Sequence, residues 1–349
     1  MPVLCFVGPT HSGKRSIANH FVETHGFKRL RVQVQHDETR ARSDSSVVLH
    51  DDNDNYNDEL GGTLTFPTSA AALAFATLNW RESFVVADLF ALLSTDAAFN
   101  LADWQKRPFV LIVAVTAETL VRFNRANSCA LSLEEFVRKD DAGMHKPPSL
   151  PSKDYSLFQI MNKASVSINN SFSSLHELHA LLDSTKVNLL DPHRLRPSWD
   201  LYFMRLCDLA AERSNCMKRR VGCVVAKDNR VIATGYNGTP KGLRNCNDGG
   251  CARCNEGVER MGGGLEFCIC LHAEENALLE AGRDRISNGG KAILYCNTCP
   301  CIQCARKIIQ VGISEVVYSL SYGMDGVTLN LFNEAGVVLR QLDQLESCF

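Results

Sequence analysis

His272-Ala273-Glu274 and Pro300-Cys301-Ile302-Gln303-Cys304 are two short clusters that together hold one histidine, one carboxylate and two cysteines. An imidazole, two thiolates and a water molecule satisfy tetrahedral Zn²⁺ and keep one position open, as in a catalytic site. We therefore predict His272, Cys301 and Cys304 as zinc ligands. Glu274 remains as a free carboxylate, for which we predict a catalytic role in proton transfer.

The spacing within each cluster predicts that both lie at helix starts. His272 and Glu274 would share the first turn of a helix over 273–281, and Cys301 and Cys304 would share one face of a helix over 301–311. Pro300 suits a helix start, because its missing N–H is not needed there. Two helix N-termini would then converge, and their positive ends favour thiolates.

The alternative to a catalytic site is a structural zinc site or a set of buried core cysteines. A C-x-x-C pair alone leaves that alternative open. The histidine and the glutamate at a second helix start argue against it, and the pair of motifs resembles the H-x-E…P-C-x-x-C signature of zinc-dependent nucleobase deaminases. In that chemistry the zinc lowers the pKa of water from about 16 toward about 7. The resulting hydroxide attacks an amidine carbon, and the glutamate passes the proton to the ring so that ammonia leaves.

The flanking sequence narrows the resemblance. Residues 214–225 (SNCMKRRVGCVV), 235–240 (GYNGTP), 271–277 (LHAEENA) and 312–318 (GISEVVY) resemble the deoxycytidylate (dCMP) deaminases, over roughly 194–342 and in their longer fungal form. The resemblance implies hydrolysis of dCMP to dUMP and ammonia, which supplies thymidylate synthesis. It also implies activation by dCTP with its Mg²⁺, inhibition by dTTP, and a homo-oligomer, commonly a hexamer.

Two rival functions stay open at this point. One is another zinc deaminase, of the tRNA adenosine or riboflavin-pathway type, against which the 214–225 and 235–240 blocks stand. The other is a nucleotide-binding regulatory protein that uses the N-terminal domain. The net charge of −2 gives no global attraction to nucleic acid, so we predict small nucleotides as partners rather than polynucleotides.

Basic residues before the 221–226 strand form the candidate phosphate site. Arg213, Lys218, Arg219 and Arg220 cluster there, and Arg220 is the first choice because arginine binds phosphate bidentately. The alternative is a solvated basic turn. Asn237 and Gly238 form a turn signal, and by the resemblance this turn also lines the substrate and effector pockets.

A cysteine-rich insertion separates this turn from His272. We predict a second, structural zinc there, because metal binding supplies the folding energy that a glycine-rich segment lacks. The alternative is a loop with reduced thiols, and the ligand set is left open among Cys216, Cys246, Cys251, Cys254, Cys268 and Cys270. The other cysteines are expected to be packing residues.

The N-terminus contains a candidate phosphate-binding loop. Gly8, Gly13 and Lys14 follow a predicted strand and precede a predicted helix, and Ser16 stands one place later than the usual hydroxyl, as in nucleoside monophosphate kinases. Asp88 is a candidate Walker-B carboxylate. An active kinase, a nucleotide-sensing domain and a purely structural platform are the three interpretations, and nucleotide sensing is favoured.

The chain organisation follows from these motifs. We predict an α/β fold with two domains. Residues 1–190 are expected to form a P-loop nucleotide-kinase-like domain built on a parallel sheet. Residues 191–349 are expected to form a cytidine-deaminase-like α/β/α domain built on a mixed five-stranded sheet. Strands are expected at 3–7, 83–87 and 109–115, loops at 37–62 and 140–156, and a linker at 191–197. No apolar run spans a membrane and the start is not a secretory signal. Fifteen cysteines without such a signal indicate a reducing compartment, so we predict a cytoplasmic protein, with the nucleus not excluded.

Overall fold

The computed structural model describes residues 2–33, 62–96, 99–126, 131–145, 155–184, 187–256, 268–321 and 326–342. The chain divides into two compact units, and the division falls after Arg196, within the predicted linker. That linker is not wholly irregular, because Pro192–Arg194 form a 3₁₀ turn that starts with the proline. None of the described helices combines the length and the apolarity that crossing a membrane requires.

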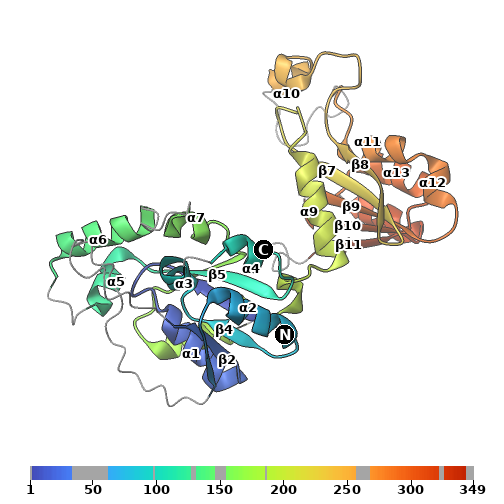
Figure 1. The fold of residues 1–349 in the computed structure, drawn as a ribbon. Helices are drawn as coiled ribbons and strands as arrows, with labels where there is room; N and C mark the ends of the chain where they lie inside the picture. Colours follow the sequence, from blue (N-terminus) through green and yellow to red (C-terminus); the bar gives the residue numbers. More distant parts are fainter. Residues whose placement is uncertain are drawn as a thin grey trace. The chain divides into compact units, whose positions relative to one another are not determined.

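The first unit contains a six-stranded sheet in which every pairing between described strands is parallel, as predicted (Figure 1). The strand order is β3-β2-β4-β1-β5-β6. The strands are β1 (Val3–Val7), β2 (Lys28–Val32), β3 (Thr63–Phe66), β4 (Phe84–Val86), β5 (Val110–Thr116) and β6 (Val166–Asn169). Three of them, β2, β3 and β6, were missing from the predicted set, because they are short and mix polar with apolar residues.

Helices cover both faces of this sheet. Along β1 the side chains alternate, so Val3, Cys5 and Val7 pack into one core and Leu4 and Phe6 into another. The helices are α1 (Lys14–His25), α2 (Ser69–Leu78), α3 (Leu89–Thr95), α4 (Leu101–Gln105), α5 (Thr119–Arg125), α6 (Leu133–His145), α7 (Leu157–Met161) and α8 (Leu175–Leu182).

Helix α6 corrects the predicted loop over 140–156, since the helix continues to His145. The physical reason is a tertiary contact. The buried guanidinium of Arg122 donates to both carboxylate oxygens of Asp140, at 2.5 and 2.6 Å. A bidentate charged pair of this kind stabilises the turn of helix that carries it, and local sequence does not reveal the partner.

The second unit contains the predicted mixed five-stranded sheet, in the order β11-β10-β9-β7-β8. Strand β7 is antiparallel to β8 and β9, whereas β9, β10 and β11 are parallel. The strands are β7 (Gly222–Lys227), β8 (Arg230–Tyr236), β9 (Ala292–Thr298), β10 (Glu315–Leu320) and β11 (Val338–Gln341). The helices are α9 (Trp199–Ala211), α10 (Ala252–Asn255), α11 (Ala273–Ala281), α12 (Arg283–Ser287), α13 (Ile302–Val311) and α14 (Gly326–Glu334).

The two faces of this sheet are covered by different helices, with α9 on one side and α11, α12 and α13 on the other (Figure 1). Alternation along β7 explains the division. Cys223 and Val225 pack in the core beneath α11 and α13, whereas Val224 and Ala226 pack beneath α9. The helix starts that carry His272 and Cys301 therefore lie on the same face.

Two glycines let helices approach the sheet backbone directly. A Cβ atom on Gly235 of β8 would lie 2.2 Å from the carbonyl oxygen of Ala273 and 2.4 Å from the amide nitrogen of Ala277, both in α11. A Cβ atom on Gly222 of β7 would lie 1.9 Å from the carbonyl oxygen of Cys207 in α9. Gly235 thereby sets the distance between β8 and the helix that follows His272.

We expect Gly235→Ala to destabilise the second unit by about 3 kcal/mol or more, because backbone atoms of α11 cannot move aside for a methyl group. The midpoint of urea unfolding measures the effect. Gly326→Ala is the matched control, since nothing lies within 4 Å of a Cβ atom there. An unfolding midpoint for Gly235→Ala equal to that of the control would contradict the packing argument.

Candidate active site

The three predicted ligands meet at one point. The ligand atoms of His272, Cys301 and Cys304 all lie within 4.8 Å of one another. The Nδ1 atom of His272 is 3.5 Å from the Sγ atom of Cys301 and 3.3 Å from that of Cys304. Tetrahedral zinc with Zn–N near 2.1 Å and Zn–S near 2.3 Å requires an N···S separation of about 3.6 Å. The donor set and its spacing therefore fit Zn²⁺.

Helix starts position these ligands: α11 has the predicted bounds 273–281, whereas α13 begins at Ile302, one residue later than predicted. His272 is the N-cap of α11 and Cys301 the N-cap of α13, both with extended backbone, and Cys304 lies in the first turn of α13. Pro300 accordingly precedes the N-cap rather than beginning the helix. Neither N-cap side chain makes a capping hydrogen bond, so both are free to face the ligand point.

Glu274 lies beside this point without joining the ligand group. It is in the first turn of α11 and only 4% exposed. Burial raises the pKa of its carboxyl, and the charge of His272 acts in the opposite direction. A buried carboxyl that is close to a metal site but not a ligand can take and return a proton.

The cysteine pair is polarised before any metal binds. Hydrogen bonds, first from the Cys304 thiol and then from His272, lower the pKa of Cys301 to about 3. One thiolate is thus available at neutral pH, and a thiolate is the form that binds metal.

The 235–238 turn is tied to its surroundings through the Asn237 side chain, which is buried. Its Oδ1 atom accepts from the Val221 amide and the Ser214 hydroxyl at 2.8 and 2.7 Å, and its Nδ2 atom donates to the Arg219 carbonyl at 2.9 Å. These bonds favour a positioning role, because they leave only one amide hydrogen for a ligand. Ser214 was not predicted as a site residue, and only its polarity beside the basic cluster could have indicated this role.

The same turn is attached to the active-site helix. Gly238 pairs with Leu271, the residue before His272, through a two-hydrogen-bond bridge. Asn276 of α11 donates to the carbonyl of Tyr236 at 3.0 Å. Asn276 was also missed as a site residue, although an asparagine inside a helix often signals such a side-chain bond.

Arg220 lies at a cavity of about 440 Å³. Arg213 and Arg220 supply its positive charge. Cys216, a candidate ligand of the second zinc, lines the cavity, whereas His272, Cys301 and Cys304 do not. The lining consists of Glu212, Arg213, Ser214, Asn215, Cys216, Met217, Arg220, Tyr236, Asn245 and Asn247. Arg220 and Tyr236 of the 235–238 turn therefore line one cavity, and the candidate catalytic zinc site is not part of its lining.

The phosphate-loop candidate has the predicted strand–loop–helix setting. Gly13 has a φ of 94° at the N-cap of α1, a conformation that favours glycine. Lys14 is buried and donates to the carbonyls of Gly8 and Pro9 at 2.6 and 2.9 Å. Its ammonium also lies 3.2 Å from the carboxylate of Asp88, while Ser16 is half-buried in α1.

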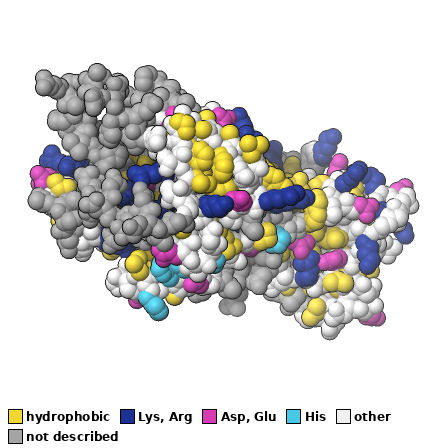
Figure 2. Space-filling model, turned by 60° about the horizontal axis from the view of Figure 1, so that its bottom comes forward, with side chains coloured by type: hydrophobic (Ala, Val, Ile, Leu, Met, Phe, Trp, Pro, Cys, Tyr) yellow, Lys and Arg dark blue, Asp and Glu magenta, His cyan; other side chains and the backbone are white. Residues whose placement is uncertain are grey.

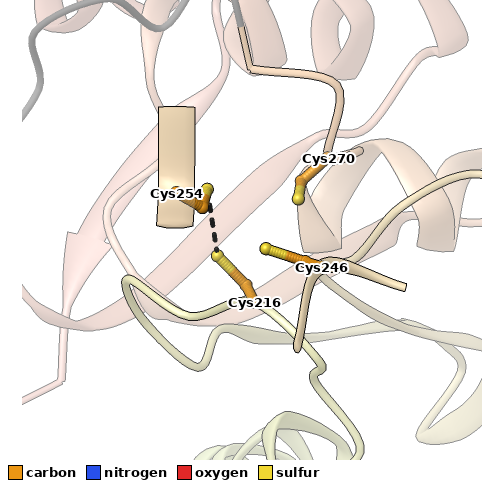
Figure 3. A group of neighbouring side chains, drawn as sticks. All are labelled: Cys216, Cys246, Cys254 and Cys270. Atoms are coloured by element: carbon orange, nitrogen blue, oxygen red, sulfur yellow. Dashed lines mark hydrogen bonds between the residues drawn. The ribbon is translucent and has the colours of Figure 1, made fainter. Parts of the chain in front are cut away.

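The five cysteines of the insertion and Cys216, from the loop after α9, are close together. They form two groups in which the sulfur atoms lie within 4.8 Å of one another: Cys216, Cys246, Cys254 and Cys270, and Cys251, Cys254, Cys268 and Cys270. In Figure 3 the four sulfurs of the first group point toward a common centre.

Seven other cysteines were predicted to be packing residues. Five of them are buried and carry free thiols, namely Cys5, Cys207, Cys223, Cys296 and Cys299. Cys129 and Cys348 lie outside the described residues.

Comparisons with known proteins agree with this site. A family model described as the cytidine and deoxycytidylate deaminase zinc-binding region matches residues 197–320. The deoxycytidylate deaminase of Schizosaccharomyces pombe is 43% identical over 345 residues, which cover 98% of this chain and 97% of that protein. The deoxycytidylate deaminase of Saccharomyces cerevisiae is 44% identical over 285 residues, or 78% of this chain and 86% of that protein.

Among solved structures, the dCMP deaminase of cyanophage S-TIM5 in complex with dCMP and dUMP is similar, with 28% identity and a TM-score of 0.33, over 40% of this chain and 94% of that chain. The S. pombe relative matches both units of this chain, not the deaminase region alone. The chain therefore belongs to the deoxycytidylate deaminase family.

Proposed function

We propose that this enzyme hydrolyses dCMP to dUMP and ammonia at the site formed by His272, Cys301, Cys304 and Glu274. The convergence of the three ligands beside a buried, unligated carboxyl carries the proposal. The names of the two fungal relatives supply the substrate. Ammonia release from dCMP tests it directly.

Each of the four residues has a distinct role in the deamination. His272, Cys301 and Cys304 would hold Zn²⁺, whose chemistry at such a site is to lower the pKa of water toward neutrality. Glu274 accepts the proton that the attacking water loses at C4 of the cytosine, and returns it to N3 of the ring. It then assists the departure of the amino group as ammonia. Its burial excludes bulk water from this transfer.

We further propose that the cavity at Arg220 binds the phosphates of an effector nucleotide, dCTP as activator or dTTP as inhibitor. Two arginines line it and the three catalytic-zinc ligands do not, so an effector fits there better than the reacting base. A triphosphate brings Mg²⁺, and Glu212 and three asparagines supply oxygen atoms in the same wall. The attachment of the 235–238 turn to Leu271 and α11 connects the cavity to the active site.

Arg220→Ala is expected to raise the dCTP concentration for half-maximal activation about tenfold or more, because a charge-assisted phosphate contact is lost. Steady-state deamination at varied dCTP measures it. Lys218→Ala is the control, since Lys218 is a neighbouring exposed cation outside the cavity lining. Unchanged activation by dCTP in Arg220→Ala would exclude Arg220 from the effector site, and a raised KM for dCMP alone would assign it to the substrate phosphate.

For residues 1–190 we propose a P-loop nucleotide-kinase-like domain that senses nucleotides, joined to a deaminase domain over 191–349. Support comes from the Lys14 ammonium, which contacts the carbonyls of the loop and the carboxylate of Asp88. A bound phosphate would replace these oxygen atoms as the partner of the ammonium. The Ser12 hydroxyl in the loop is fully buried, and no hydrogen-bond partner for it exists among the described residues.

Lys14→Ala is expected to weaken ATP binding to the full chain at least about tenfold, because an ammonium that pairs with phosphate charge is lost. Isothermal titration calorimetry measures the affinity. The exposed neighbour Arg15→Ala serves as the control. If the wild-type chain binds no nucleoside triphosphate outside the deaminase domain, the structural-platform interpretation replaces this one.

Self-association and a structural metal complete the proposal. We propose a homo-oligomer, a hexamer by the family resemblance, and note that α9 exposes Trp199, Tyr202 and Leu209. Figure 2 shows basic side chains interspersed with acidic ones on the visible described surface, an arrangement suited to small nucleotides rather than polynucleotides.

We also propose that the six-cysteine group binds zinc in a structural role. The reduced thiols are those of a cytoplasmic or nuclear enzyme.

A further inference from the structure

Cys216 and the five cysteines of the insertion form two groups that share two members. Each of the two groups of four has a pair of its own, Cys216 with Cys246 and Cys251 with Cys268. Cys254 and Cys270 belong to both groups. Among the described residues, no metal-ligand group combines a member of one pair with a member of the other.

A single zinc ion would use only one of the two groups and leave two of the six cysteines without a metal, because structural zinc takes four ligands. Two tetrahedra that share an edge need six ligands, of which two belong to both tetrahedra. We propose that the insertion holds a binuclear zinc–thiolate cluster, with Cys254 and Cys270 bridging both ions and the two pairs as terminal ligands. The inference rests on the structural zinc proposed above and is independent of the catalytic site.

The sulfur separations fit tetrahedral zinc in both halves. With Zn–S near 2.3 Å, two sulfurs on one ion lie about 3.8 Å apart. Cys216 and Cys254 are 3.8 Å apart, Cys251 and Cys268 are 3.8 Å apart, and Cys254 and Cys268 are 3.7 Å apart. A shared cysteine, Cys254, thus stands at ligand distance from a terminal cysteine of each half (Figure 3 shows the first of these contacts).

The surroundings compensate the negative charge of six thiolates. The backbone amides of Lys218 and Arg219 donate to Cys216, and Asn255 donates to Cys246 over 3.8 Å. On the other half, the backbone amides of Cys254 and Ile269 donate to Cys251, and the Arg253 guanidinium donates to Cys268 and Cys254. Every terminal sulfur therefore has an N–H donor, as a buried charged group requires.

The local chain needs the cross-links that the cluster provides. Between the Gly238 bridge and His272 the described structure consists of a three-residue 3₁₀ turn and the four-residue helix α10. Cys216 comes from the loop after α9, and Cys270 lies two residues before His272. Two ions with six ligands tie these segments together at the entrance to the catalytic helix, and the thiol protons are released to solvent on binding.

Metal stoichiometry of the full wild-type chain is the test. After saturation with Zn²⁺ and removal of excess metal, plasma mass spectrometry and native mass spectrometry should both give three zinc ions per chain, one catalytic and two in the cluster. Two ions per chain would overturn the binuclear cluster and leave a single structural zinc. One ion would overturn the structural zinc as well, without affecting the deaminase proposal.

Two double variants separate bridging from terminal ligands. Cys254→Ser with Cys270→Ser should reduce the count from three to one, whereas Cys251→Ser with Cys268→Ser should remove at least one ion. A count that stays at the wild-type value in the second variant would show that Cys251 and Cys268 are not zinc ligands and would overturn the cluster. Cys5→Ala, a buried cysteine in the other unit, should keep three. X-ray absorption of the wild-type chain needs no variant, and the absence of a zinc–zinc scattering contribution would contradict the cluster.

Discussion

Glu274→Gln is expected to lower kcat for dCMP deamination by about 10³-fold, while the zinc content stays at the wild-type value. The amide cannot take a proton from water or return one to the ring, and a positioned acid–base group contributes about 10²- to 10⁴-fold. Zinc is retained because the carboxyl lies outside the ligand group. Ammonia release and metal analysis on the same preparation measure both quantities.

Glu275→Gln is the matched control for this variant. Glu275 follows Glu274 in α11 and is part of an ion pair with Lys307 at 2.6 Å, where both side chains are partly exposed. Such a surface pair contributes little, so kcat should stay within about twofold of wild type. Loss of zinc from Glu274→Gln would show that the carboxyl is a ligand, and retained activity would remove it from the mechanism.

Cys304→Ser is expected to remove one zinc ion per chain and to reduce deamination below about 10⁻³ of wild type. The side chain is 1% exposed and stands 3.3 Å from the His272 Nδ1 atom, and a hydroxyl is a far poorer zinc ligand than a thiolate. Metal analysis and ammonia release measure the two effects.

Cys299→Ala provides the comparison for the loss of a buried thiol. Cys299 is buried and lies two residues before Cys301, but it is outside the ligand group. It should keep the full zinc content and most of the activity. If Cys304→Ser kept the same zinc content as Cys299→Ala, the assignment of Cys304 as a ligand would be wrong.

The metal site was predictable from sequence because its chemistry is local. A histidine and a glutamate two residues apart, with two cysteines three residues apart, leave little choice of ligands, and helix starts present them. The bounds of the first helix were predicted correctly, whereas the second was predicted to begin at Cys301 and begins at Ile302, since such a boundary depends on backbone conformation rather than on residue type.

Other features depend on contacts between distant segments. The role of Gly235 requires knowing that α11 crosses β8 at that residue, and the end of α6 requires the Arg122–Asp140 pair. Short strands such as β2 carry too few apolar residues to be distinguished from loops. The six cysteines were identified, but the sharing of Cys254 and Cys270 between two groups exists only in three dimensions.

The most direct test of the central claim is an ammonia-release assay of the wild-type enzyme on dCMP, CMP, dCTP, deoxycytidine and an adenosine substrate, each with and without dCTP or dTTP. We expect dCMP to have the highest kcat/KM, dCTP to raise the rate and dTTP to lower it. A higher kcat/KM for any other substrate, or no ammonia from dCMP, would contradict it.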